Sequence, residues 1–93
     1  QRMSEQTIET ISAGLKDLIK ERLDIDHETI GVNDDSPLFD ENAWGIDSVD
    51  VLDIVLGIEE RYGVKIRQDD SSKAAFGSIR SLATHIEQIR SRS

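Results

Sequence analysis

Ser48 is the residue of this chain whose type and position best suit a covalent modification. It follows Asp47 at the start of the segment GIDSVDVLDIVLGIEERY, residues 45–62. Asp47 suits the N-cap of a helix, which places Ser48 in the first turn. Free backbone N–H groups and the positive end of the helix dipole favour an anion at that position. A phosphate group attached to Ser48 would therefore be well placed.

The segment that follows Ser48 has the spacing of an amphipathic helix. Apolar residues recur at the i, i+3, i+4, i+7 intervals expected of a helix that faces a core, and they are Val49, Val51, Leu52, Ile54, Val55, Leu56, Ile58 and Tyr62. Acidic residues fill the gaps, namely Asp50, Asp53, Glu59 and Glu60. We expect the apolar stripe to face a helical bundle and the acids to face water or a partner.

Negative charge is concentrated around Ser48. The formal net charge is −8, and residues 23–60 contain twelve acidic residues without a lysine or arginine. This charge argues against nucleic acid and against anionic membrane surfaces as partners. An acidic surface can serve solubility alone. Because the acids centre on one serine, we interpret them as a docking face for basic partners.

The residues around Ser48 resemble the acyl carrier protein family. Asp47-Ser48-Val49, followed by an acidic amphipathic helix, is similar to the motif whose serine carries a 4'-phosphopantetheine arm in that family. The resemblance extends over LFDENAWGIDSVDVLDIVLGIEERYGVKI, residues 38–66, and includes the flanking segments 34–39 and 74–86. It therefore covers most of the chain.

The resemblance implies a carrier protein that is a substrate of enzymes and not itself an enzyme. A phosphopantetheinyl transferase with Mg²⁺ would transfer the arm from coenzyme A to Ser48 Oγ, and the thiol of the arm would carry acyl groups as thioesters in fatty acid or related acyl-chain biosynthesis. The implied recognition residues for acyl-transferring and chain-modifying enzymes with basic patches are Asp47, Asp50, Asp53, Glu59 and Glu60. The implied acyl pocket is formed by Val49, Leu52, Leu56 and Ile58.

Several residues depart from the pattern of the family. Val49 replaces a leucine, the segment from Asp40 to Trp44 is longer than the usual approach, and Lys65 and Arg67 stand where acids or proline are common. These departures indicate a specialised carrier. A polyketide carrier and an aminoacyl or D-alanyl carrier stay open as alternatives.

Two more distant alternatives to a carrier are a calcium-binding module and an unmodified interaction module. Asp24, Asp26 and Glu28 alternate as in a calcium loop with Asp35 at its twelfth position, but the sixth position holds Thr29 in place of glycine. We therefore predict no metal site. The other alternative is an acidic helical interaction module in which Ser48 is unmodified.

Catalysis by the chain itself is not indicated. The sequence has no cysteine, so any thioester chemistry requires an added thiol. Ser48 lacks the G-x-S-x-G elbow of serine hydrolases. His27 and His85 have no second histidine or cysteine at metal-ligand spacing, and we expect both to lie on the surface or to pack.

Ser48 would be positioned by helices, because the sequence predicts an all-α fold. We expect a small four-helix bundle with a long ordered loop between its first two helices. We expect a single acyl-carrier-like domain over residues 1–93, with residues 1–3 an expression remnant or disordered. The predicted elements are helix 4–23, loop 24–46, helix 47–62, short helix 69–75 and helix 78–91. We expect Trp44 to anchor the loop by packing, and Gly63 to cap the central helix.

We expect the protein to be a cytoplasmic monomer. No apolar run approaches the roughly 20 residues that span a bilayer, and no basic-then-apolar secretory signal is present. Membrane insertion is therefore not expected.

Overall fold

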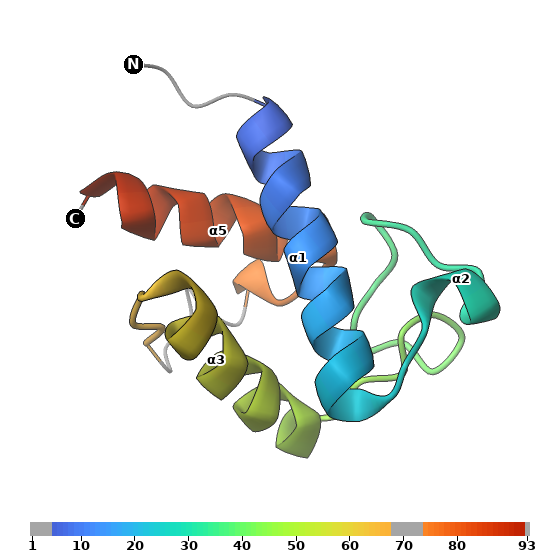
Figure 1. Ribbon diagram of the computed structural model, residues 1–93. Helices are drawn as coiled ribbons and strands as arrows, with labels where there is room; N and C mark the ends of the chain where they lie inside the picture. Colours follow the sequence, from blue (N-terminus) through green and yellow to red (C-terminus); the bar gives the residue numbers. More distant parts are fainter. Residues whose placement is uncertain (1–4, 68–73, 93) are drawn as a thin grey trace.

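The computed structural model describes residues 5–67 and 74–92 of the chain, without the side chains at positions 5, 6, 27 and 92. Its helices are α1 (Glu5–Leu23), α2 (His27–Ile30), α3 (Ser48–Tyr62) and α5 (Ile79–Arg92) (Figure 1). Within these ranges no β-strand forms, so the prediction of a small all-α fold is confirmed. The predicted short helix at 69–75 lies mostly outside the described residues, of which 74 and 75 are helical.

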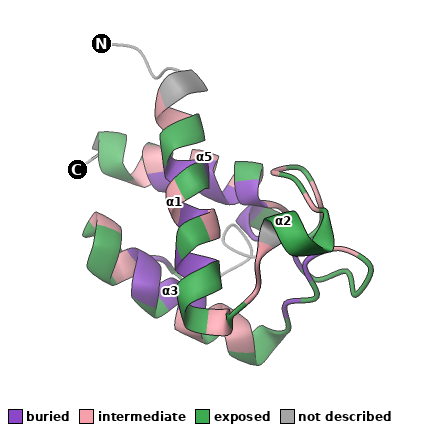
Figure 2. Ribbon diagram, turned by 45° about the vertical axis from the view of Figure 1, so that its right-hand side comes forward, coloured by how far each residue is buried: buried purple, intermediate pink, exposed green. Residues whose placement is uncertain are grey.

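The core lies where α1, α3 and α5 face one another. Figure 2 shows buried positions on the inner faces of these helices and exposed positions on their outer faces. The residues with no exposed surface are Leu15, Ile19, Leu38, Ile54, Ile58, Ile79, Leu82, Ala83 and Ile86. Each helix contributes one stripe at helical spacing, as an amphipathic helix packed on a core should.

The connection between α1 and α3 is ordered and is tied to α1 and to the segment that precedes α5. Leu38 and Trp44 are buried, which confirms that Trp44 packs as an anchor. The backbone N–H of Leu38 donates to Gly77 O at 3.2 Å, and that of Ile46 donates to Leu38 O at 2.8 Å. Lys16 Nζ pairs with Asp34 Oδ1 at 2.8 Å. These contacts fix the approach of the chain to the start of α3.

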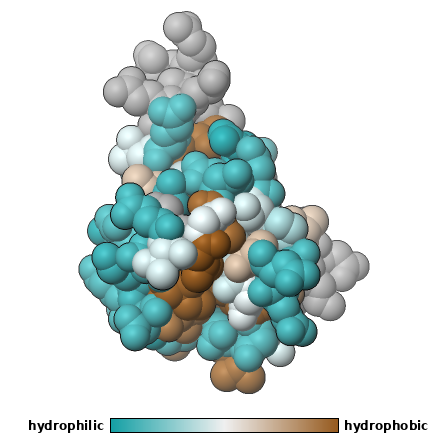
Figure 3. Space-filling model, turned by 90° about the vertical axis from the view of Figure 1, so that its right-hand side faces the viewer, coloured by the Kyte–Doolittle hydropathy of each residue, from teal (hydrophilic) through white to brown (hydrophobic). Residues whose placement is uncertain are grey.

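Part of this connection differs from the expectation. Residues 27–30 form the short helix α2, where the sequence predicted a loop. The apolar residues Ile30 and Phe39 of this connection are 44% and 49% exposed, so they do not anchor it in the core as Trp44 does. Figure 3 views the side of the molecule that carries α2, and it shows hydrophobic surface bordered by hydrophilic residues.

The end of α3 is fixed by Gly63. Gly63 adopts the left-handed conformation, with φ of 67°, and its N–H donates to Glu59 O at 3.0 Å. Glycine takes this conformation without the steric cost of a Cβ. The predicted C-cap is confirmed. None of the helices in the described ranges combines the length and apolarity needed to span a membrane.

Candidate functional site

Ser48 is the first residue of α3 and is exposed to solvent. The preceding Asp47 is the N-cap, with extended backbone angles of −105° and 179°. Its Oδ1 accepts a hydrogen bond from the N–H of Asp50 at 3.0 Å, and Asp50 Oδ2 accepts from the N–H of Asp47 at 3.4 Å. This reciprocal pair is a capping box with aspartate at its third helical position. The sequence prediction that Asp47 caps the helix is confirmed.

The capping box determines how Ser48 is presented. The capping box of Asp47 and Asp50 fixes the backbone of the first turn of α3. Ser48 belongs to this turn and is exposed to solvent. The positive end of the helix dipole favours a phosphodiester there, whereas the two neighbouring carboxylates oppose added negative charge. The same carboxylates attract a basic enzyme or a metal-bound substrate to the hydroxyl. The site therefore fits a serine that is modified by another protein.

The five predicted recognition acids do not share one environment. Asp53 Oδ1 and Glu60 Oε1 both accept from Arg22, at 2.5 and 3.1 Å. Glu59 Oε2 accepts from the backbone N–H of Ile66 at 3.2 Å. The acids were expected to face water or a partner, and three of them also make contacts within the chain. Asp47 and Asp50 lie beside Ser48, and each has only one carboxylate oxygen in the capping box.

The four residues of the predicted acyl pocket are not brought together. Ile58 is fully buried, but Val49, Leu52 and Leu56 are 72%, 56% and 56% exposed. The prediction that these three face the bundle is wrong. The buried stripe of α3 consists of Ile54, Val55, Gly57 and Ile58. The apolar residues of α3 therefore form two overlapping stripes. The stripe of Val49, Leu52 and Leu56 faces solvent, and the other one packs on the core.

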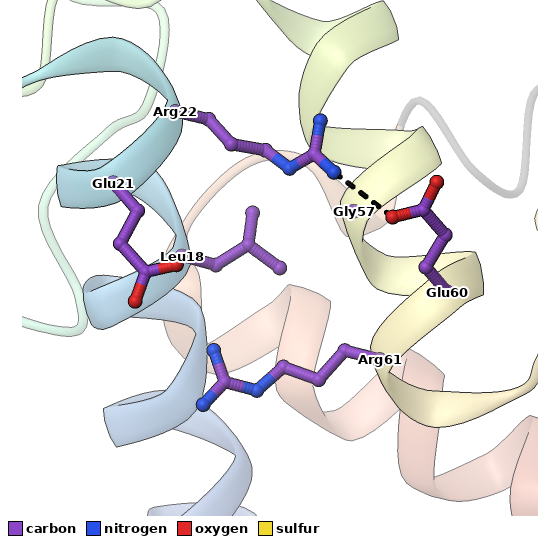
Figure 4. A pocket seen from close by; sticks show the side chains of 6 residues that line it. All are labelled: Leu18, Glu21, Arg22, Gly57, Glu60 and Arg61. Carbon is purple, nitrogen blue, oxygen red and sulfur yellow. Dashed lines mark hydrogen bonds and ion pairs between the residues drawn. The ribbon is translucent and has the colours of Figure 1, made fainter.

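Arg22 is the residue of this region that sequence reasoning missed. It lies just before the acidic segment of the sequence, yet its side chain extends from α1 to α3 (Figure 4). A shallow cleft between the two helices is lined by Leu18, Glu21, Arg22, Gly57, Glu60 and Arg61. The sequence did contain one indication of this contact. Gly57 is an isolated glycine within a predicted helix, and such a glycine often marks a close approach of another group.

Two of the four acids of the calcium-loop alternative, Asp26 and Asp35, are engaged in other contacts. Asp26 Oδ1 accepts from the N–H of Glu28 at 3.0 Å, and Asp26 Oδ2 pairs with Lys20 at 3.7 Å. Asp35 pairs with Arg80 of α5 at 2.8 Å. Across residues 5–67 and 74–92, no group of three or more histidine, cysteine or acidic side chains is arranged to hold a metal ion.

The fold is that of a small helical protein with an exposed serine at the start of α3, and comparison with known proteins places the chain in a family. Residues 13–86 match the family described as the phosphopantetheine attachment site. The acyl carrier protein of Thermotoga maritima is 30% identical over 80 residues, which are 86% of this chain and 91% of that protein. Acyl carrier protein AcpXL of Rhizobium meliloti is 32% identical over 83 residues, 80% of this chain and 83% of that protein.

A third relative, the acyl carrier protein of Campylobacter hominis, is 28% identical over 75 residues, 81% of this chain and 87% of that protein. Because the family match spans most of the sequence, the chain belongs to the acyl carrier protein family. Its prosthetic group is accordingly a covalently attached 4'-phosphopantetheine. Such proteins interact with phosphopantetheinyl transferases and with acyl-handling enzymes.

Proposed function

We propose that Ser48 is the attachment site of the 4'-phosphopantetheine arm, and that the protein carries acyl groups for fatty acid or related acyl-chain biosynthesis. The observation that carries this proposal is the exposed Ser48 hydroxyl at the first position of α3, held by the capping box of Asp47 and Asp50. The thiol of the arm supplies the thioester chemistry that a chain without cysteine lacks. The protein acts as a monomeric carrier, and catalysis belongs to its partners.

The residues around Ser48 have two roles in this proposal. Asp47 and Asp50 attract basic patches of the transferase and of acyl-transferring enzymes, since complementary charge raises the rate of encounter. Val49, Leu52 and Leu56 are exposed on the same helix and are therefore available to contact a docked enzyme. Ile58 is buried in the core, and we assign to it, among the predicted pocket residues, a contact with cargo sheltered inside the bundle.

The test is arm attachment followed by intact mass spectrometry. The protein is incubated with coenzyme A, Mg²⁺ and a promiscuous phosphopantetheinyl transferase, and one arm per chain is expected. Ser48→Ala should abolish the mass shift and remain folded, because Asp47 still caps α3 and alanine is tolerated in a first turn. Ser91→Ala, which removes an exposed serine of α5, is the matched control and should be modified like the wild type.

Attachment that persists in Ser48→Ala would refute the assignment. If the arm is attached as expected, incubation with fatty acyl, polyketide and aminoacyl loading enzymes then distinguishes the cargo by mass. Loading by an aminoacyl ligase alone would contradict a role in acyl-chain biosynthesis.

A further inference from the structure

Arg22 joins two acids that lie two helical turns apart. Its Nη1 donates to Asp53 Oδ1 at 2.5 Å, and its Nη2 donates to Glu60 Oε1 at 3.1 Å. Asp53 and Glu60 are seven residues apart in α3, so they project from one face of the helix. Figure 4 shows the Arg22 side chain extending from α1 toward Gly57 and Glu60 of α3, with a dashed line to the Glu60 carboxylate.

Gly57 provides the space that Arg22 occupies. Gly57 is buried, and a Cβ at this position would lie 2.5 Å from Arg22 Nε and 3.0 Å from Arg22 Cδ. A Cβ atom does not approach another heavy atom that closely, so any side chain at position 57 would displace the arginine. Glycine at position 57 therefore allows Arg22 to occupy the position from which it contacts the two acids.

The consequence is an uneven distribution of charge along α3. Arg22 compensates Asp53 and Glu60, and Glu59 accepts a hydrogen bond from Ile66 N–H. Asp47 and Asp50 accept only from each other's backbone among the described residues, and these bonds leave their negative charge uncompensated. The attraction for a basic protein is therefore strongest at the end of α3 that carries Ser48.

We propose that Arg22 is a specificity-determining residue that masks Asp53 and Glu60 and so confines docking to the Ser48 end of α3. It selects partner enzymes whose cationic side chains meet Asp47 and Asp50. A partner with a longer basic patch, extending toward Glu60, meets the Arg22 cation and is disfavoured by like charge. This inference rests on the proposed function, because it concerns the enzymes that act on Ser48.

Three variants test the masking. Arg22→Gln removes the cation, and Gly57→Ala keeps it but displaces it from Asp53 and Glu60. Arg61→Gln is the matched control, because it makes the same change in net charge on the same cleft, while Arg61 donates to Gly14 O at 3.4 Å and not to the acids. The readout is kcat/KM for arm attachment by a transferase with a basic docking surface, measured from low to high salt.

At low salt, Arg22→Gln and Gly57→Ala should each raise kcat/KM about threefold, because two carboxylates become available to the basic enzyme. Their advantage should disappear at high salt, where the charges are screened. Arg61→Gln should stay near the wild-type value. Adding Asp53→Asn and Glu60→Gln to Arg22→Gln should cancel the gain.

Equal effects of Arg22→Gln and Arg61→Gln would overturn the inference, since net charge alone would then explain them. A Gly57→Ala protein that melts cooperatively and reacts at the wild-type rate would also overturn it. Failure of the proposed function looks different, because the wild-type protein would then acquire no arm at Ser48.

Discussion

The Tyr62 hydroxyl occupies the space beside Gly14 where any other residue would place its Cβ. Tyr62 ends α3, Gly14 lies in the middle of α1, and the hydroxyl donates to the backbone oxygen of Ile11 at 3.4 Å. A Cβ on Gly14 would overlap the hydroxyl but would lie 3.6 Å from Tyr62 Cζ, an ordinary contact. Glycine in a helix costs about 1 kcal/mol relative to alanine. At position 14 the missing side chain leaves room for the Tyr62 hydroxyl, so α3 can pack closely against α1.

We predict that Gly14→Ala destabilises the protein, although alanine is the better helix former. The methyl group collides with the hydroxyl, and overpacking costs about 1–3 kcal/mol, which exceeds the gain in helix propensity. Chemical denaturation measures the free energy of unfolding. In a Tyr62→Phe background the same substitution should be neutral or stabilising, since the hydroxyl is absent. Equal effects of Gly14→Ala in both backgrounds would show that the collision does not control stability.

The same tyrosine makes stability depend on alkaline pH. Burial raises the pKa of Tyr62, while the positive charges of Arg61 and Arg90 partly oppose this shift. A raised pKa means that the folded state favours the neutral phenol. The contribution to stability is complete below the ordinary tyrosine pKa of 10.0 and is lost as pH rises through the higher folded value.

The measurement is direct, because the chain has one tyrosine. The absorbance of the phenolate should appear at higher pH in the folded protein than in denaturant. Tyr62→Phe should lose less stability than the wild type between pH 9 and about pH 11, the range around the ordinary tyrosine pKa. Parallel alkaline unfolding curves for the two proteins would contradict this prediction.

The helices could be predicted from the sequence because their apolar periodicity is strong. The Ser48 position in α3 could also be predicted, since Asp47 is a typical N-cap. The sequence did not predict which side of α3 packs against the core, because the apolar residues of this helix form two overlapping stripes. Periodicity cannot tell that Ile54 and Ile58 face the core while Val49 faces solvent.

The charge pattern illustrates a second limit of sequence reasoning. Counting charges along the chain showed an acidic segment without bases, but Arg22 pairs with Asp53 and Glu60 across a separation of 31 and 38 residues. Such a contact depends on how α1 and α3 are packed. A local count of charge therefore overstates the free acidity of α3, and the same reasoning missed the role of Gly57.

Ser12 offers a test of core packing in α1. Its side chain is buried, and among the described residues its Oγ has no hydrogen-bond partner. A buried hydroxyl without a partner costs about 1–3 kcal/mol, and alanine is the better helix former. Ser12→Ala should therefore stabilise the fold by about 1 kcal/mol. The melting temperature and denaturant midpoint both report this change.

Ser81 is the matched control for Ser12. It is a partly buried helical serine, but its Oγ donates to Ala75 O at 2.6 Å and accepts from the N–H of Ser78 at 3.0 Å. Ser81→Ala should destabilise the protein, because it leaves these groups without a partner. If Ser12→Ala is the more destabilising of the two substitutions, the Ser12 hydroxyl is contributing to stability.

Charge reversal on α3 should affect stability as well as recognition. A simple solvent-facing acid could be reversed at little cost, but Asp50 completes the capping box and Glu59 accepts from Ile66 N–H. Asp50→Lys also places a cation at the positive end of the helix dipole. We predict that Asp50→Lys and Glu59→Lys each lower the free energy of unfolding by about 1 kcal/mol.

The neutral substitutions Asp50→Asn and Glu59→Gln separate the two contributions, because each keeps a side-chain oxygen that can accept the same hydrogen bond. Both should retain most of the stability measured by denaturation. Recognition should follow charge instead: Asp50→Asn should slow arm attachment at low salt, whereas Glu59→Gln, farther from Ser48 along α3, should slow it less. Lysine variants as stable as the wild type would mean that these two hydrogen bonds do not hold α3 in place.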